Sequence, residues 1–104
     1  AVLPVQACIA LITYSGVRVH DAENWLCKAV LTERELVSCA RWVPGCAALL
    51  LGNQSGEVVE YDLKEMDRAF FTSRKPYANA PRAAHRSHTE IVTDILEETP
   101  TNFV

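Results

Sequence analysis

The sequence predicts an all-β fold of four-stranded antiparallel units, because a strand–turn–strand pattern occurs twice among its 104 residues. Residues 8–21 and residues 48–62 each contain an apolar run, a Ser-Gly turn, a second run and a final Asp. The two Ser-Gly turns lie 40 residues apart, and the two Asp residues lie 41 apart. A period of about 40–45 residues with four strands per unit is typical of β-propeller blades. The repeat positions are Gly16, Asp21, Gly56 and Asp62.

Each expected strand follows from its residue pattern. Residues 8–14 are rich in aliphatic residues and end at a turn, and residues 17–21 alternate between apolar and polar. Residues 46–52 form a nearly continuous apolar run, which is typical of a strand covered on both faces. The strands are expected at 8–14, 17–21, 26–31, 36–43, 46–52, 57–62, 68–73 and 90–96. The side chains expected to be largely buried between blades are Ile9, Leu11, Trp42, Leu49, Leu51 and Val58. A helical alternative stays open for residues 26–36 and 91–98, where good helix formers occur.

This pattern divides the chain into parts of a β-propeller. We expect residues 1–35 to supply the last three strands of one blade, and 36–74 to form a complete second blade. Residues 75–88 are expected to be a basic inter-blade loop, and 89–104 the start of a third blade. Because a propeller must close its ring, we expect about two blades to be a fragment of a larger protein.

Composition excludes several classes of protein. The chain is 49% hydrophobic and 22% charged, as in ordinary globular domains. Its net charge of −3 argues against a general nucleic-acid binder, because such domains are usually strongly basic. No apolar run approaches the roughly 20 residues of a membrane span, so no membrane association is expected.

The cysteine and histidine residues suggest no catalytic or metal site. Most of the four cysteines lie in apolar, strand-like runs, which favours buried hydrophobic side chains and a reducing, intracellular compartment. His85 and His88 lie three residues apart, but no closely spaced cysteine pair accompanies them, as a structural zinc site would require. No glycine-rich phosphate loop occurs. We therefore expect a non-catalytic protein without metal or cofactor.

Residues 74–86 form the one stretch that predicts partner binding. They contain four basic residues and no Asp or Glu, and two prolines indicate an exposed loop. Such a loop could dock on an acidic protein surface, or contact RNA through its basic residues and Tyr. The net charge favours the protein over the nucleic acid, and a solvated insertion without a partner stays open as an alternative. The candidate partner-binding residues are Arg74, Lys75, Tyr77, Arg82 and Arg86.

The chain resembles WD-repeat β-propellers in the order of several short motifs. Residues 87–92 match the opening of a repeat, with Ser87 in place of Gly and His88 as the repeat histidine. Residues 40–44 match the first inner strand and its Pro turn, and residues 54–56 match the hairpin. Tyr61-Asp62 and His20-Asp21 stand where the family has Trp-Asp. Since the Trp is replaced in both places, the family's buried His–Asp–Ser–Trp network is incomplete.

The resemblance implies a rigid scaffold that binds other proteins in a multi-subunit assembly. Residues 88–94 are similar to blades of large WD-repeat scaffold proteins of cilia and flagella. The resemblance therefore implies a cytoplasmic protein, with the axoneme as one location and tubulin or axonemal proteins as partners. The competing interpretations are an RNA-binding propeller and a non-catalytic domain of a larger enzyme.

Overall fold

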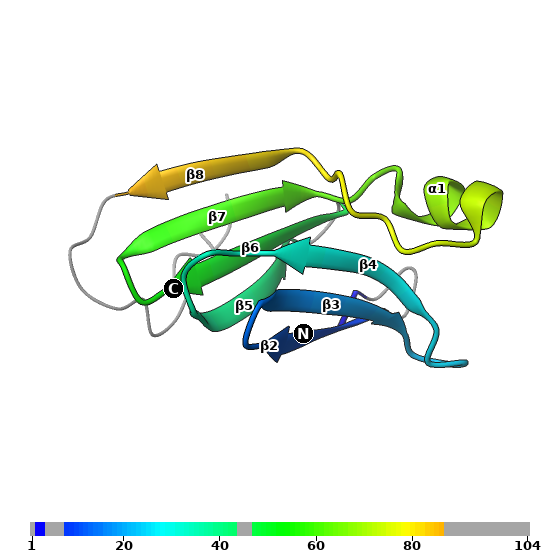
Figure 1. Cartoon of the computed structure of the whole chain (residues 1–104), viewed down its shortest axis with the longest axis horizontal. Helices are drawn as coiled ribbons and strands as arrows, with labels where there is room; N and C mark the ends of the chain where they lie inside the picture. Colours follow the sequence, from blue (N-terminus) through cyan, green and yellow to red (C-terminus); the bar gives the residue numbers. More distant parts are fainter. Residues whose placement is uncertain (1, 4–7, 44–46, 87–104) are drawn as a thin grey trace, which may run out of the picture.

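Two antiparallel sheets and one helix make up the fold (Figure 1), and the computed structural model describes residues 2–3, 8–43 and 47–86. The first sheet has the order β1-β2-β3-β4 and the second the order β5-β6-β7-β8, so neighbours in each sheet follow one another in sequence. The first sheet consists of β1 (Val2–Leu3), β2 (Cys8–Thr13), β3 (Gly16–Asp21) and β4 (Cys27–Thr32). The second consists of β5 (Val37–Val43), β6 (Ala48–Asn53), β7 (Glu57–Asp62) and β8 (Arg82–Arg86), and helix α1 (Met66–Ser73) lies between β7 and β8.

The predicted β-rich, antiparallel character is confirmed. Six of the expected strands coincide with β2 to β7 to within two residues at each end. The helical alternative for residues 26–36 is wrong, because β4 pairs with β3 across this region. The alternative for residues 91–98 and the strand expected at 90–96 lie outside the described residues, as do His88 and the predicted third blade at 89–104.

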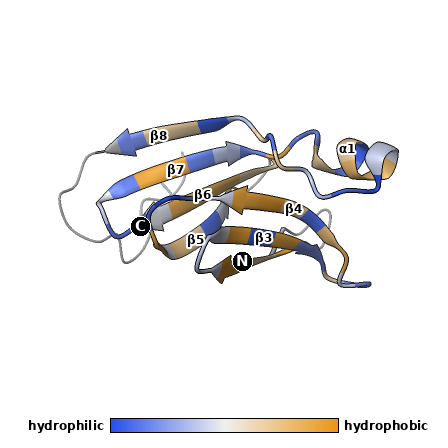
Figure 2. Ribbon diagram, viewed as in Figure 1, coloured by the Kyte–Doolittle hydropathy of each residue, from blue (hydrophilic) through white to orange (hydrophobic). Residues whose placement is uncertain are grey.

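The two sheets share one core. Alternate residues of β2, β3, β4, β6 and β7 point into it, since side chains along a strand face opposite sides in turn. In β5 a register shift between Val37 and Cys39 allows both Val37 and Trp42 to reach the core. Figure 2 shows the hydrophobic colour concentrated along β4 and β6. The fully buried centre contains Val19, Leu31, Leu49, Leu51 and Val59.

The burial predicted for the apolar strands is confirmed on one face of each sheet. Trp42 and the predicted Leu49 and Leu51 are buried in the shared core. Ile9, Leu11 and Val58 were expected to be buried as well, but the structure leaves them partly exposed. They alternate with core residues along β2 and β7, so they lie on the outer faces.

The β2–β3 turn requires glycine at Gly16. The residue has φ of 144°, a conformation that other residues rarely adopt. A Cβ atom there would lie 1.9 Å from the main-chain oxygen of Leu31 in β4. The nearby bond from the Glu33 N–H to the Ser15 oxygen, 2.8 Å long, ties the turn to the end of β4. The glycine of the repeat therefore allows three strands to approach closely.

The strand predicted at residues 68–73 is wrong, because the segment is part of helix α1. Asp67 in the first turn complements the positive end of the helix dipole. Met66 is fully buried and anchors the helix on the core. Arg74 ends the helix in a left-handed conformation, with its N–H bonded to the oxygen of Phe70. The apolar pair Phe70-Phe71 suggested a strand, but short apolar runs do not distinguish the two structures.

The basic stretch 74–86 is not one exposed loop, because its last part is strand β8. Arg82 pairs with Tyr61 of β7 in the sheet register, and Arg86 pairs with Glu57. The fourth strand of the second sheet is therefore β8, and this sheet extends to Arg86 rather than ending at residue 74. Residues 63–81 form an insertion between β7 and β8 that contains α1.

Candidate functional site

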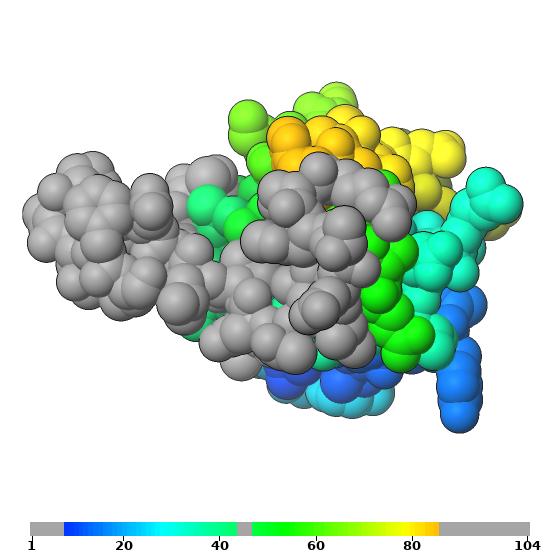
Figure 3. Space-filling model, turned by 90° about the vertical axis from the view of Figure 1, so that its left-hand side faces the viewer, coloured from blue at the N-terminus to red at the C-terminus, as the bar shows by residue number. Residues whose placement is uncertain are grey.

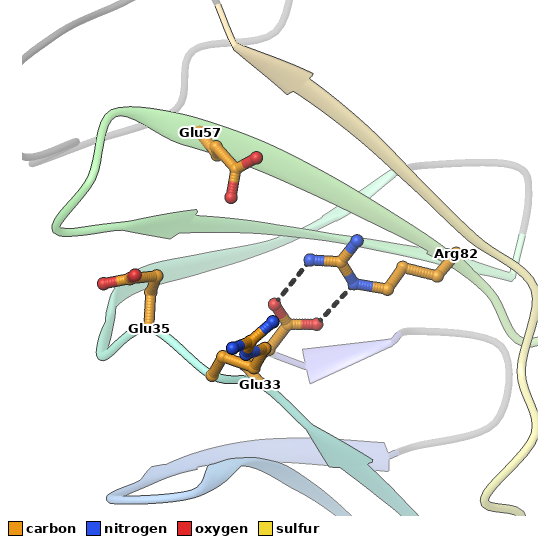
Figure 4. Close-up of a pocket in the computed structure, with 5 residues that line it drawn as sticks. Glu33, Glu35, Glu57 and Arg82 are labelled. Carbon is orange, nitrogen blue, oxygen red and sulfur yellow. Dashed lines mark hydrogen bonds and ion pairs between the residues drawn. The ribbon is translucent and has the colours of Figure 1, made fainter.

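A polar pocket of about 350 Å³ lies where the link between the two sheets meets the second sheet. Figure 4 shows Glu33 and Arg82 facing each other in the pocket, with Glu57 pointing toward it and Glu35 pointing away from the pair. Its lining residues are Glu33, Arg34, Glu35, Glu57 and Arg82.

Glu33 is the buried centre of this pocket. Its side chain is only 2% exposed, although it lies in the short link between β4 and β5. Arg82 donates two hydrogen bonds to its carboxylate, from Nε at 2.8 Å and from Nη2 at 2.9 Å. The Tyr61 hydroxyl donates to the same carboxylate. The two strands of the second sheet that carry Tyr61 and Arg82 thus hold the link from the first sheet.

The pKa values follow from this geometry. Burial alone raises the pKa of Glu33, but hydrogen bonds from Arg82 and Tyr61 and the positive charge of Arg82 outweigh it, so the pKa is lowered. Burial, together with the hydrogen bond to Glu33, raises the pKa of Tyr61 to about 12. The hydrogen bonds to Glu33 raise the pKa of Arg82. At neutral pH the three groups are therefore a carboxylate, a neutral phenol and a guanidinium.

The arrangement of Glu33, Tyr61 and Arg82 is better suited to holding segments of the chain together than to acid–base catalysis. An efficient general acid or base has a pKa near the working pH, whereas those of Glu33 and Tyr61 move away from neutrality. The carboxylate oxygens of Glu33 are also occupied by Arg82 and Tyr61. These hydrogen bonds join three segments of the chain, namely the β4–β5 link, β7 and β8.

The structure separates the five predicted partner-binding residues into different environments. Arg82 is held by Glu33, and its side chain is 41% exposed. Tyr77 is partly buried and packs against the core. Arg74 and Lys75 are exposed at the end of α1. Arg86 ends β8.

The insertion that carries α1 covers the outer edge of the first sheet. The Tyr77 N–H donates to the Lys28 oxygen at 2.7 Å, and its carbonyl accepts from the Val30 N–H at 3.2 Å. The Lys28 ammonium donates to the Asp67 carboxylate of α1 at 2.5 Å. The insertion between β7 and β8 thereby pairs with β4, so Tyr77 has a structural role.

The end of α1 combines an aromatic side chain with positive charge. Phe71 is 72% exposed, an unusual degree for a large apolar side chain within a helix. The Arg74 guanidinium lies over its ring, 5.2 Å from the centroid. Lys75 follows directly and is also exposed. We call Phe71, Arg74 and Lys75 the α1 surface.

The repeat residues have matching structural roles in the two sheets. Asp21 ends β3 and accepts hydrogen bonds from the Glu23 and Asn24 N–H groups, the first at 2.8 Å. Asp62 ends β7 and accepts one from the Lys64 N–H at 3.0 Å. Each aspartate therefore closes an Asx turn after the third strand of its sheet. These bonds, with a smaller effect of Lys28, lower the pKa of Asp21.

Asn53 and Glu57 form the β6–β7 turn of the second sheet, which corresponds to the β2–β3 turn at Gly16 in the first sheet. The Asn53 Oδ1 accepts from the N–H groups of Ser55 and Glu57, both at 3.0 Å, and from the Ser55 hydroxyl. Its amide nitrogen donates to Glu57 Oε1 at 3.2 Å. Gly56 completes this turn with φ of 90°. The carboxylate of Glu57 is thus fixed beside the pocket.

Sequence reasoning missed Glu33, Lys28 and Asp67. Glu33 belongs to a charged link that reads as solvent-exposed, and its partner Arg82 lies 49 residues away. The only local signal was the unusual density of charge between two strands, which does not distinguish a buried carboxylate from exposed ones.

The described residues contain no cluster of three or more side chains suited to a metal ion. Within residues 8–43, Cys8, Cys27 and Cys39 form no disulfide, and burial raises the pKa of the Cys8 thiol. The described part of the chain also contains no helix of the length and apolarity needed to cross a membrane.

Comparison of the chain with protein-family models, with curated proteins and with solved structures found no match in any of the three.

Proposed function

We propose that the chain is a non-catalytic segment of a propeller-type scaffold that binds an acidic protein through the α1 surface. The observation that carries this proposal is the exposed Phe71 with Arg74 over its ring and Lys75 beside it. Helix α1 lies in an insertion between two paired strands, so its exposed face is free to serve contacts. Aromatic and arginine side chains are the residue types enriched at binding hot spots.

Two features support the propeller part of the proposal. Each sheet is an antiparallel meander, and the paired Asx turns repeat at the predicted spacing. The outer faces carry the partly exposed apolar side chains Ile9, Leu11 and Val58, which a further sheet on either side would cover. Stacked sheets of this kind present loops on both rims without moving parts.

Charge complementarity favours an acidic partner. Of the basic residues near the insertion, Arg82 is neutralised by Glu33, Arg68 by Glu65, and Lys28 by Asp67. Arg74 and Lys75 remain exposed and have no carboxylate within ion-pair distance among the described residues. The resemblance to ciliary scaffolds makes the acidic surface of tubulin the first partner to test.

Co-sedimentation with microtubules at low and high salt tests this function. The double variant Arg74→Asn/Lys75→Ser removes both charges, and Asn tolerates the left-handed conformation at position 74. We expect roughly three- to tenfold weaker association, mostly at low salt, as exposed charge pairs contribute about 0.2–1 kcal/mol each. Phe71→Ser should weaken association at both salt concentrations.

The matched control is Arg18→Ser/Arg34→Ser, which removes the same charge from exposed positions outside α1. It should leave association unchanged. Equal association of both double variants, with intact folding, would show that the α1 surface has no role. An unmodified chain that does not bind microtubules would exclude tubulin as the partner.

A further inference from the structure

The outer edge strands of the two sheets differ in how they are protected from pairing with another chain. These strands are β4 in the first sheet and β8 in the second. Proteins block an exposed strand edge with charged residues, with proline or with a covering segment. β8 directly follows Pro81, and its basic residues and histidine are Arg82, His85 and Arg86. β4 contains Lys28 as its single charged residue and needs a cover. Figure 3 shows the orange β8 at the upper surface of the molecule, with yellow atoms of the insertion beside it.

The cover of β4 is Tyr77, which lies in the insertion between β7 and β8 and occupies outward main-chain groups of the strand. The Tyr77 N–H donates to the Lys28 oxygen at 2.7 Å, and the Tyr77 oxygen accepts from the Val30 N–H at 3.2 Å. The Glu33 N–H donates to the Ser15 oxygen just beyond β3 and β4, so the alternation of antiparallel pairs turns the main-chain groups of Val30 away from β3. Another strand can therefore pair along β4 only after Tyr77 has left.

The insertion is fixed at both ends and held by few contacts between them. The buried residues at its ends are Leu63, Met66 and Ala80. None of residues 67–79, all of which the structure describes, is buried, and we call this segment the strap. It is held by the two hydrogen bonds of Tyr77, by the contact of Tyr77 with the core and by the Lys28–Asp67 ion pair. A segment with few buried contacts opens at a lower free-energy cost than global unfolding requires.

We infer that the strap prevents β4 from pairing with β4 of a second copy of the chain. Full-length antiparallel pairing of two β4 strands places Val30 opposite Val30 and Lys28 opposite Thr32, so no like charges meet. The outward main-chain groups of these residues then bond across the two strands. The net charge of −3 opposes this association only weakly, because salt screens exposed charges beyond about 8 Å. This role goes beyond partner binding by the α1 surface and does not depend on it.

The second sheet does not offer the same contact. Full-length antiparallel pairing of two β8 strands places Arg82 opposite Arg86 twice, and like charges directly opposite each other are destabilising. The edge that lacks charge is thus the one that the strap covers.

Amide hydrogen exchange of Val30, followed by NMR in the 104-residue chain, tests whether Tyr77 holds the strap closed. Tyr77→Pro removes both the ring and the N–H that donates to Lys28, whereas Tyr77→Ala removes the ring and keeps the N–H. We expect the Val30 amide to exchange about three- to tenfold faster in Tyr77→Pro than in Tyr77→Ala, as for one lost hydrogen bond. The Leu31 amide, which faces β3, should show no such difference.

Sedimentation velocity over a range of protein concentrations tests what the open edge does. The parent chain should be monomeric, and the dissociation constant of the dimer should be about three- to tenfold lower for Tyr77→Pro than for Tyr77→Ala. Adding Val30→Pro to Tyr77→Pro removes an outward N–H without removing a bond to β3, so it should abolish the dimer. Val30→Glu is a second blocking variant, because it places like charges opposite each other in the dimer but faces Arg18 within its own sheet. Circular dichroism melts establish that each variant is folded.

Three results would overturn the inference. The first is equal Val30 exchange and equal association of Tyr77→Pro and Tyr77→Ala, because the main-chain pairing of Tyr77 would then not hold the strap. The second is a Tyr77→Pro dimer that persists with both Val30 variants, because it would form through another surface. The third is a parent chain that already dimerises and that Val30→Pro makes monomeric, because the strap would then leave β4 open.

Discussion

The buried carboxylate of Glu33 shows how a single residue can join two sheets. Removing a charged group from water is costly unless hydrogen bonds replace the lost solvation. Arg82 supplies two of these bonds and Tyr61 a third, and both residues belong to the second sheet. The link that carries Glu33 follows the first sheet directly. The ion pair is therefore positioned to fix how the link lies against β7 and β8.

Glu33→Gln should lower the free energy of unfolding at pH 7 by about 2–3 kcal/mol. This is less than for a fully buried ion pair, because the Arg82 side chain is 41% exposed and keeps part of its hydration. The pKa of Glu33 is lowered in the folded chain. The stabilisation by its carboxylate is therefore complete above pH 4.5, the ordinary pKa of the group, and is lost as the pH falls through the lowered pKa of the folded chain. Urea unfolding at pH 7 and pH 3 measures this difference.

The difference in stability between the parent chain and Glu33→Gln should thus shrink toward pH 3. Glu35→Gln, on the same link but exposed, is the control and should change stability by less than about 0.5 kcal/mol. A loss for Glu33→Gln that is equally large at pH 3 would show that the carboxylate charge is not what stabilises the link.

At the scale of elements, β2 to β7 could be predicted because their signals are local. Alternation and turn residues specify each hairpin, and its strands are neighbours in sequence. Helix α1 was missed because Phe70-Phe71 reads as a strand, and what fixes the helix is the burial of Met66 in the shared core. Strand β8 was missed because its sequence, Arg-Ala-Ala-His-Arg, has little strand propensity and pairing with β7 determines it.

Met66→Ala should therefore destabilise the chain far more than a change on the exposed face of α1. Met66 is fully buried, so its truncation should cost about 2–5 kcal/mol. Phe71→Ala removes a larger side chain, but one that is 72% exposed, and should cost about 0.5 kcal/mol or less. Thermal or urea unfolding monitored by circular dichroism compares the two. Equal losses would mean that α1 does not dock through Met66.

At the scale of the whole molecule, the candidate site was the part least accessible from sequence. The predicted basic residues were grouped by proximity in the chain, yet the fold distributes them among α1, the edge of β4 and β8. The polar pocket instead combines residues from 33 to 82, whose meeting depends on how the two sheets pack. Local patterns carry no information on such packing.

The packing of the two sheets gives neighbouring residues of β6 unequal burial. Comparing truncations of two such residues tests the arrangement of the sheets directly. Leu49 points into the shared core and is fully buried, whereas Leu50 points to the outer face and is partly exposed. In the 104-residue chain, Leu49→Ala should cost about 2–5 kcal/mol. Leu50→Ala should cost only about 1 kcal/mol, since a partly exposed side chain gains less from burial.

Leu49 and Leu50 are the same residue type on the same strand. Urea unfolding of the two variants therefore measures only the effect of which face of the sheet the side chain occupies. Equal losses would contradict a single core between the two sheets, because both faces of β6 would then be packed. In a longer chain with a further sheet against the outer face, the propeller proposal makes a different prediction. There Leu50 would be covered as Leu49 is, and its truncation would become equally costly. The change in the Leu50→Ala cost between the two chains therefore measures whether the outer face is a packing surface.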